Sequence, residues 1–313
     1  MALKWVAKAI VQKTISFFPY REKLNYLFQK YVTRGIDLDD THFAYKIQAA
    51  SDHLKYMQKY AHNGILCSQA VLELGTGWYP VVPVAMFLSG TMSVTSIDIR
   101  PWMTKKSILI SLEKFIEWKN NGKLDEYLPA INQLRWSELL SLVENRENIT
   151  KQDLLDKLNL RTMVCSANRT GLPDQSFDFI CSNNTFEHIY PEMLGAILSE
   201  FKRLMKPDGM MSHHIDMSDH FAHFDSGISI YNFLKFSRKK WAMIDNRIQP
   251  QNRLRYSDYI AMYSRLKIPV TETKIWEGNV AELTKLNIAP EFAYYSARDL
   301  AISHAYIVSR YLN

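Results

Sequence analysis

The chain has 313 residues, of which 47% are hydrophobic and 22% are charged. This composition is typical of a globular protein and argues against a disordered one. The formal net charge of +6 is concentrated in two segments, because residues 1–36 and residues 235–255 each hold seven basic side chains and a single acidic one. The rest of the chain is acidic on balance. Because the basic charge is not spread over the whole surface, we do not expect nucleic acid as a partner.

The three cysteines indicate a cytoplasmic protein. Cys67, Cys165 and Cys181 have no C-x-x-C spacing, and an odd number does not suit a disulfide framework, so we expect reduced, mostly buried thiols. No stretch approaches 18 uninterrupted apolar residues, and no transmembrane span is expected. A signal peptide is not expected either, because Lys8 interrupts the apolar stretch 5–11 and no small-residue cleavage site follows.

Residues 2–18 are predicted to form a basic amphipathic helix. Lys4, Lys8 and Gln12 recur at helical spacing, with apolar side chains across from them, and Pro19 ends the pattern. Such a helix could lie on the anionic inner face of a membrane as a peripheral contact, or dock its apolar face on its own domain. The sequence leaves both alternatives open.

Short apolar runs begin at residue 70 and alternate with helical stretches. Seven runs are predicted to be strands, at residues 70–74, 94–99, 162–167, 177–182, 210–215, 270–275 and 302–308. Helices are expected at 81–88 and 191–205, with helical insertions at 101–161 and 216–262. This order predicts an α/β fold with a doubly wound, seven-stranded, mostly parallel sheet.

The stretch before the first strand differs in character. Residues 21–62 have a helical, tyrosine-rich pattern without strand signals. We therefore divide the chain into an N-terminal helical extension or cap, residues 1–66, and an α/β domain, residues 67–313.

The first predicted strand ends in Glu73-Leu74-Gly75-Thr76-Gly77. Glycines at a strand end let backbone amides approach a ligand. A dinucleotide fingerprint would need a third glycine where this chain has Pro80, and this disfavours a nicotinamide cofactor. Asp98, at the end of the second predicted strand, could accept hydrogen bonds from both hydroxyls of a ribose. The pattern therefore favours a single nucleoside.

Four segments together resemble the class I S-adenosylmethionine-dependent methyltransferases, and most closely their small-molecule and sugar-type branch. They are VLELGTGW, SIDI, SANRTGLPDQSFDFICSNNTFEHI and EFKRLMKPDG, in this order over residues 70–215. The resemblance implies a Rossmann-like sheet whose last strand is antiparallel. It also implies S-adenosylmethionine as cofactor and S-adenosylhomocysteine as product.

The resemblance also implies roles for residues at the strand ends. They are Glu73 for the methionine amino group, Gly75, Thr76 and Gly77 for the bed of the cofactor, Asp98 for the ribose, Ile99, Ser166 and Ala167 for the adenine, and Asn183 for the methionine side. Ser166 stands where the family usually has Asp, which puts the hydrogen bond to the adenine amine in question.

Histidines are the candidates for the base that takes the acceptor's proton, because imidazole titrates near neutral pH. His188 is the first candidate, although it could equally serve a structural role at a helix start. His214 and His220 are alternatives, and His213 and His214 should point to opposite faces of a strand. No metal is expected.

A metal remains the less favoured alternative for the segment that follows His214. If residues 216–223 form a helix, then Asp216, His220 and His223 share one face and could hold a divalent ion. The spacing matches no zinc signature, so we expect these side chains to line the acceptor pocket instead.

The basic segment 235–255 interleaves aromatic and basic side chains, which suits a sugar ring or an anionic acceptor, or else forms a solvated helical face. Parts of it resemble methyltransferases of bacterial surface-polysaccharide biosynthesis. We therefore expect O-methylation of a saccharide or another small polar acceptor. Alternatives are a nucleic-acid methyltransferase, which the lack of a Pro-Pro-aromatic turn after Ser182 disfavours, a catalytically silent cofactor-binding scaffold, and a nicotinamide oxidoreductase.

Overall fold

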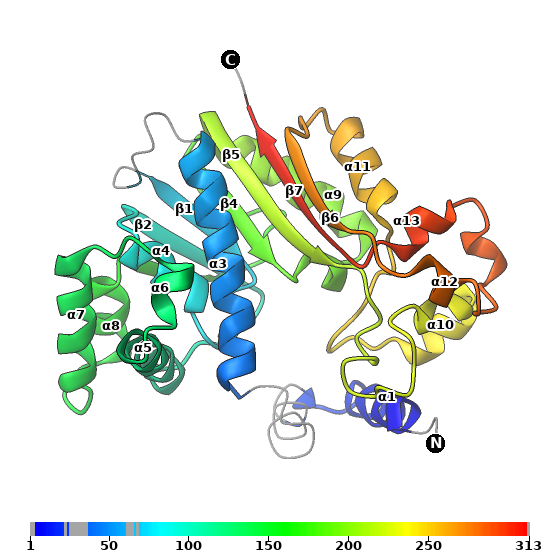
Figure 1. Ribbon diagram of the computed structural model, residues 1–313, viewed down its shortest axis with the longest axis horizontal. Helices are drawn as coiled ribbons and strands as arrows, with labels where there is room; N and C mark the ends of the chain where they lie inside the picture. Colours follow the sequence, from blue (N-terminus) through cyan, green and yellow to red (C-terminus); the bar gives the residue numbers. More distant parts are fainter. Residues whose placement is uncertain (1–3, 22–23, 25–36, 61–65, 67–68, 312–313) are drawn as a thin grey trace.

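The computed structural model describes the chain except for residues 1–3, 22–23, 25–36, 61–65, 67–68 and 312–313 (Figure 1). Its strands form a seven-stranded sheet in the order β3-β2-β1-β4-β5-β7-β6. Their bounds are β1 Ala70–Leu74, β2 Ser93–Asp98, β3 Leu160–Val164, β4 Phe177–Asn183, β5 Met205–Asp216, β6 Glu272–Trp276 and β7 His304–Arg310. β7 runs antiparallel to β5 and β6, and the other pairs are parallel. The expected Rossmann-like methyltransferase fold is confirmed.

β1 keeps its predicted bounds, β4 is one residue longer, and β2, β6 and β7 are shifted by one or two residues; the larger changes at β3 and β5 have visible reasons. β3 starts at Leu160 instead of residue 162, because Asn159 adopts φ 50° after a helix and turns the chain directly into pairing with β2. β5 starts at Met205 instead of residue 210. The Pro207-Asp208-Gly209 turn lies inside the strand, where the pairing register with β4 shifts.

Helices cover both faces of the sheet (Figure 1). On one face lie α3 Asp40–Tyr60, α4 Val81–Leu88, α5 Lys105–Asn120, α6 Leu124–Tyr127, α7 Gln133–Glu144 and α8 Lys151–Lys157. On the other face lie α9 Pro191–Leu204 and α11 Tyr256–Arg265. The segment expected as an insertion at 101–161 is therefore a group of helices packed beside the sheet between β2 and β3.

The central strand β1 shows how the sheet is held. All five of its residues are buried. Val71 belongs to the hydrophobic cluster on the α3 and α4 side, whereas Leu72 and Leu74 belong to the cluster on the α9 side. Neighbouring residues of a strand point to opposite faces, so a continuous apolar run is what burial on both faces requires. The ends of β1 and its neighbours are thereby fixed in position.

The N-terminal helix α1, Lys4–Ile15, packs away from the sheet against α10, Arg238–Ile244, as Figure 1 shows. The ring of Trp5 lies 5.8 Å from that of Phe221 and 5.7 Å from that of Phe236. Of the two alternatives for this helix, docking on its own domain is therefore present. α12 Val280–Leu283 and α13 Ala297–Ala301 contribute to the same hydrophobic cluster.

Of the expected helical stretch 21–62, residues 40–60 form α3, which shares a hydrophobic cluster with β1 and α4, and residues 22–23, 25–36 and 61–62 lie outside the described residues. The domain boundary at residue 66 stays a prediction. Of the cysteines, Cys165 and Cys181 are free thiols, half-buried and buried, and Cys67 lies outside the described residues. Among the described helices, none has the length and apolar content needed to cross a membrane.

The strand order locates the ligand crevice. From β1 the chain proceeds outward to β2 and β3, and it then returns to place β4 on the other side of β1. The crossover connections therefore diverge between β1 and β4. In such sheets ligands bind beyond the carboxyl ends of the strands at this point.

Candidate active site

A cavity of about 250 Å³ lies at the carboxyl ends of β1 and β4. Glu73, Gly75, Gly77 and Asn183 line it, as the sequence predicted for the cofactor site. Thr76 lines it as well. Across from them, α3 contributes side chains that sequence reasoning missed: His42, Tyr45 and Lys46.

The turn after β1 needs its glycines. Gly75 and Gly77 adopt φ 80° and 73°, in the left-handed region that side chains other than glycine disfavour. A Cβ atom on Gly75 would lie 2.3 Å from the Oγ1 of Thr185, so the backbone approaches the turn after β4 too closely for any side chain. The turn therefore has left-handed backbone angles and packs closely against Thr185.

The carboxyl group of Glu73, which lines this cavity, has a raised pKa. Burial raises its pKa to about 7, although the hydroxyl of Thr76 and the ammonium of Lys46 favour the carboxylate. Lys46 in turn has a lowered pKa because it is buried, against the attraction of Glu73 and Asp98. A ligand ammonium group placed here would complete the charge balance of the buried carboxylate.

A hydrogen-bonded chain orients Asn183. His53 Nε2 lies 2.9 Å from the Oδ1 of Asn183, and His53 Nδ1 lies 2.9 Å from the Oγ of Ser212. Burial lowers the His53 pKa to about 4, so the ring is neutral at pH 7. It then donates to the amide oxygen and accepts from the hydroxyl. The amide of Asn183 also acts on the buried Glu73 carboxylate, where its hydrogen bond favours the charged form and lowers the Glu73 pKa. Sequence reasoning missed His53, because it lies on α3 and not in a motif at the end of a strand.

The remaining cofactor candidates surround β2. Asp98 Oδ2 accepts a hydrogen bond of 3.2 Å from the backbone N–H of Gly77, and burial raises the Asp98 pKa. Ile99 is 69% exposed, as a residue that packs on a ligand ring would be before binding. Ser166 is exposed and Ala167 is buried in the core, and neither is among the residues that line the cavities at the ends of β1 and β2.

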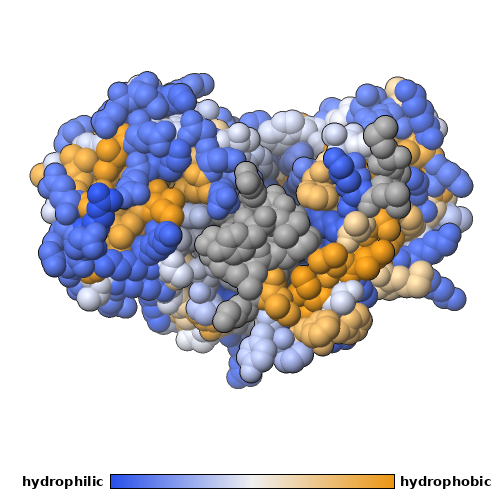
Figure 2. Space-filling model, turned by 90° about the horizontal axis from the view of Figure 1, so that it is seen from below, coloured by the Kyte–Doolittle hydropathy of each residue, from blue (hydrophilic) through white to orange (hydrophobic). Residues whose placement is uncertain are grey.

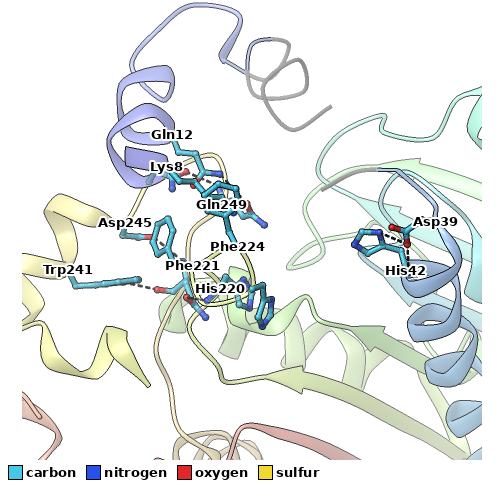
Figure 3. A pocket seen from close by; sticks show the side chains of 13 residues that line it. Lys8, Gln12, Asp39, His42, His220, Phe221, Phe224, Trp241, Asp245 and Gln249 are labelled. Atoms are coloured by element: carbon cyan, nitrogen blue, oxygen red, sulfur yellow. Dashed lines mark hydrogen bonds and ion pairs between the residues drawn. The ribbon is translucent and has the colours of Figure 1, made fainter. Parts of the chain in front are cut away.

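A second cavity, of about 490 Å³, adjoins the first (Figure 3). Lys8 and Gln12 from α1, His220 and Phe224 from the loop after β5, and residues 241–251 line one side of it. Figure 3 shows Asp39 and His42 facing them from the start of α3. Because His42 also lines the first cavity, the two spaces meet there.

The cluster after β5 gathers around one buried carboxylate. The Oδ2 of Asp216 lies 3.4 Å from His220 Nε2 and 3.7 Å from His223 Nε2, and its Oδ1 lies 3.4 Å from His304 Nε2. Burial by itself would raise the Asp216 pKa, but His220 and His304 lower it well below its usual range. Residues 216–223 do not form the helix on which the metal alternative depended, because Asp216 ends β5 and the residues after it form a loop with turns. The loop still brings Asp216, His220 and His223 together.

His213 and His214 point to opposite faces of β5, as predicted. The ring of His213 stacks on Phe186 at 4.3 Å, and that of His214 stacks on Tyr306 at 4.4 Å. Burial lowers the pKa of each histidine to about 3. Both are therefore weak bases held in aromatic surroundings.

His188 follows β4 in the short helix η3, Phe186–His188. Its Nδ1 lies 2.7 Å from the carbonyl oxygen of Pro250 and therefore carries the ring proton. Burial lowers its pKa to about 4, with His220 contributing. Ligand atoms of Glu187, His188 and His220 all lie within 4.8 Å of one another, which makes this group the candidate for a metal. Sequence reasoning did not assign Glu187 a role.

The segment 235–255 lines the larger cavity through Trp241, Asp245 and its amide side chains, but its basic side chains do not line it as expected. The guanidinium of Arg253 is buried and donates to the carbonyl of Phe233 at 3.0 Å, and that of Arg255 donates to the carbonyls of Met217 and Ile302 at 2.8 and 2.6 Å. The other five basic residues of the segment are exposed. These two arginines hold loops together, because buried carbonyl groups need donors. The ammonium group that lines the larger cavity belongs to Lys8.

Comparison with known proteins finds similarity to methyltransferases. A family model described as a methyltransferase domain matches residues 137–212, about a quarter of the chain. No curated protein matches. Among solved structures, a Galdieria sulphuraria protein assigned as a sarcosine dimethylglycine methyltransferase is similar at 17% identity and a TM-score of 0.46, over 84% of this chain and 86% of that one.

The Burkholderia thailandensis 1,6-didemethyltoxoflavin-N1-methyltransferase, solved with its substrate and S-adenosylhomocysteine, is similar at 14% identity and a TM-score of 0.44, over 95% of this chain and 92% of that one. These similarities are too distant to assign an activity. The chain thus has a doubly wound seven-stranded sheet, and its residues 137–212 are similar to a methyltransferase domain.

Proposed function

We propose that this protein transfers a methyl group from S-adenosylmethionine to an oxygen atom of a small polar acceptor, in particular a saccharide. The observation that carries the proposal is the pair of adjoining cavities. One has the glycine turn and the buried polar groups expected for the cofactor, and the other is lined by polar groups around His220. Donor and acceptor would meet near His42.

The residues at the strand ends fit the cofactor. Glu73 offers a buried carboxylate for the methionine ammonium, and Asn183 lines the same cavity beside it. Asp98 stands at the end of the neighbouring strand, where two ribose hydroxyls would donate to it. The cofactor supplies a methyl group on a positively charged sulfur. The protein's part is to place this group and to exclude water from it.

Transfer is a direct displacement at the methyl carbon. The acceptor oxygen forms the new bond, the carbon–sulfur bond breaks with its electrons going to sulfur, and the acceptor hydroxyl loses its proton. Of the three histidines expected to take part, His220 lines the larger cavity. His188 and His214 have pKa values lowered to about 4 and 3, which makes them poor proton acceptors at neutral pH. We assign the acceptor end of the site to His220.

An acceptor with hydroxyl groups and a negative charge suits the lining of this cavity. Gln12, Gln249 and Gln251 offer amide groups, and Trp241 offers an aromatic face of the kind that stacks on sugars. Lys8 supplies the positive charge, with its ammonium 4.9 Å above the ring of Phe224. An anionic or phosphate-linked sugar is therefore the acceptor class we favour.

The outer side of α1 supports peripheral contact with an anionic membrane. Ile10, Phe17, Phe18 and Met243 are between 53% and 76% exposed, and Lys4 and Lys240 are exposed nearby in sequence. Figure 2 views the molecule from the side of α1 and shows apolar surface there. Apolar side chains beside basic ones suit a bilayer with acidic headgroups.

The membrane contact can be tested by sedimentation with phosphatidylglycerol vesicles. Phe17→Ser should abolish this sedimentation, and sedimentation that is unchanged would contradict the assignment.

The proposed reaction can be tested with S-adenosylmethionine carrying a tritiated methyl group. We expect label in nucleotide-linked sugars or other hydroxyl acceptors. Label found in amines or in nucleic acid alone would contradict the proposal. Tight binding of the cofactor without transfer to any acceptor of a broad panel would favour a catalytically silent scaffold.

A further inference from the structure

Glu187 is a carboxylate in an environment that leaves it uncompensated. Its side chain is 2% exposed, and no side chain donates to either carboxylate oxygen. The backbone N–H groups of Glu187 and Asp216 favour the carboxylate, but burial outweighs them and raises the Glu187 pKa. A buried carboxylate that is not fully compensated costs several kcal/mol unless a proton or a cation accompanies it. Unsatisfied buried groups are rare in native structures, and a bound ion is one of their explanations.

Two imidazoles stand beside this carboxylate. The rings of His188 and His220 have centroids 4.8 Å apart, and the ligand atoms of both lie within 4.8 Å of that of Glu187. The Nδ1–H of His188 is held by the Pro250 carbonyl, so its Nε2 carries a lone pair. A histidine whose other nitrogen donates to a backbone carbonyl is prepared as a metal ligand.

We propose that Glu187, His188 and His220 bind one divalent transition-metal ion of the zinc type. Two imidazoles and one carboxylate form a ligand set that holds such an ion and leaves a position open. Atoms bound to one zinc ion stand roughly 3–3.5 Å apart, so small side-chain rotations would close the site. The carboxylate of Asp216, 3.4 Å from His220 Nε2, adds a second negative charge beside the ion.

The turn that carries two of the ligands is clamped from outside. Asn252 donates from its Nδ2 to the carbonyls of Phe186 and Ile189, both at 2.8 Å, and from its backbone N–H to the carbonyl of Glu187 at 2.9 Å. Together with the Pro250 carbonyl, these bonds fix η3 on both sides of the ligands. A binding site keeps its geometry when neighbouring groups lock the ligands in this way.

The ion would face the acceptor, because His220 also lines the larger cavity. A hydroxyl group bound to a divalent ion loses its proton far more readily than a free one. His220 would then act as a ligand, and the ion would replace a free imidazole base. Only this use of the ion rests on the proposed function, since the binding of a metal does not require it.

Metal binding can be measured on the protein alone. We would strip the full chain with a chelator and titrate it with Co²⁺ and then Zn²⁺, without cofactor or acceptor. We expect one ion per chain and a visible Co²⁺ absorption band that Zn²⁺ removes. Glu187→Gln, which keeps the shape of the side chain, and His220→Asn should each weaken binding at least about tenfold.

Two control variants separate this site from other binding. Glu192→Gln removes an exposed carboxylate at the start of α9, and His223→Gln removes a histidine near Asp216 that is outside the proposed set. Both should bind Co²⁺ as the native protein does, and circular dichroism should show that all four variants are folded.

The proposal is overturned if the native protein binds neither ion, or if Glu187→Gln and His220→Asn bind as it does. Glu187 would then be a protonated carboxyl group. Loss of the ion in His223→Gln to the same extent would also overturn the proposed ligand set. Metal binding without methyl transfer would refute the proposed function alone, and methyl transfer in a protein that binds no metal would refute this inference alone.

Discussion

The cavity at the strand ends and the larger cavity beside His220 are built in different ways. Residues that directly follow β1 and β4 form the first, and the sheet fixes them. The second is assembled from α1, the loop after β5 and residues 241–251, which side-chain bonds to backbone groups hold together. A rigid site suits the cofactor, and a site made of loops suits an acceptor, because loops can vary without disturbing the sheet. We therefore expect mutations to separate cofactor binding from acceptor binding.

The largest expected effect is on cofactor binding at Asp98, which lines a small cavity that shares Gly77 with the first cavity. Asp98→Ala removes two hydrogen bonds to a charged acceptor, each worth roughly 1.5–3 kcal/mol. The affinity for S-adenosylhomocysteine should fall at least about 100-fold, which calorimetric titration measures. Asp125→Ala, at an exposed carboxylate on α6, is the control and should leave the affinity unchanged. Equal affinities in both variants would remove Asp98 from the site.

The next effect concerns how the second cavity is held together. Arg255→Met leaves buried carbonyls of Met217 and Ile302 without donors, and the free energy of unfolding in urea should fall by about 2–5 kcal/mol. Arg247→Met, in the same basic segment but exposed, should change it by less than about 0.5 kcal/mol. Similar unfolding curves for the two variants would show that Arg255 does not hold these loops.

A smaller effect should appear as a pH dependence of the first cavity. The pKa of Glu73 is raised to about 7, so below pH 7 this carboxyl is neutral and cannot attract the ligand's ammonium group. The affinity for S-adenosylhomocysteine should rise about tenfold from pH 6 to pH 8. In Glu73→Gln the affinity should be lower at pH 8 and independent of pH over this interval. A flat profile in the native protein would contradict the assignment.

The smallest effect should fall on the second cavity alone. Lys8→Gln removes the ammonium that lines it, and the KM for an anionic acceptor should rise a few-fold. Affinity for S-adenosylhomocysteine should not change. High salt should raise the KM of the native protein in the same direction. A KM insensitive to both changes would argue against an anionic acceptor.

The two cavities also differ in how much of them could be predicted from the sequence. Glu73, Gly75, Gly77 and Asn183 could be placed because each lies within a few residues of a strand end, and the order of strands brings such ends together. Strand bounds shifted where a local feature intervened, as at Asn159.

The second cavity could be predicted only in part. Of the side chains expected to line the acceptor pocket, His220 and His223 do so, but the cavity also joins side chains that are far apart in the sequence. Lys8 and Gln249 line the same space although no pattern relates them.

Arg253 and Arg255 looked like acceptor ligands because sequence composition does not reveal that their guanidinium groups are buried against carbonyls. Glu187 lies in a motif that draws attention to the neighbouring histidine, and its lack of side-chain donors is visible only in the fold.

The most direct test of the account is calorimetric titration of the native protein with S-adenosylhomocysteine and, separately, with NADH. The site made of the first cavity, with Glu73 and the glycine turn, and of Asp98 in the small cavity that shares Gly77 with it should bind S-adenosylhomocysteine tightly, one molecule per chain, and should not bind NADH. Tight binding of NADH without binding of S-adenosylhomocysteine would contradict the account.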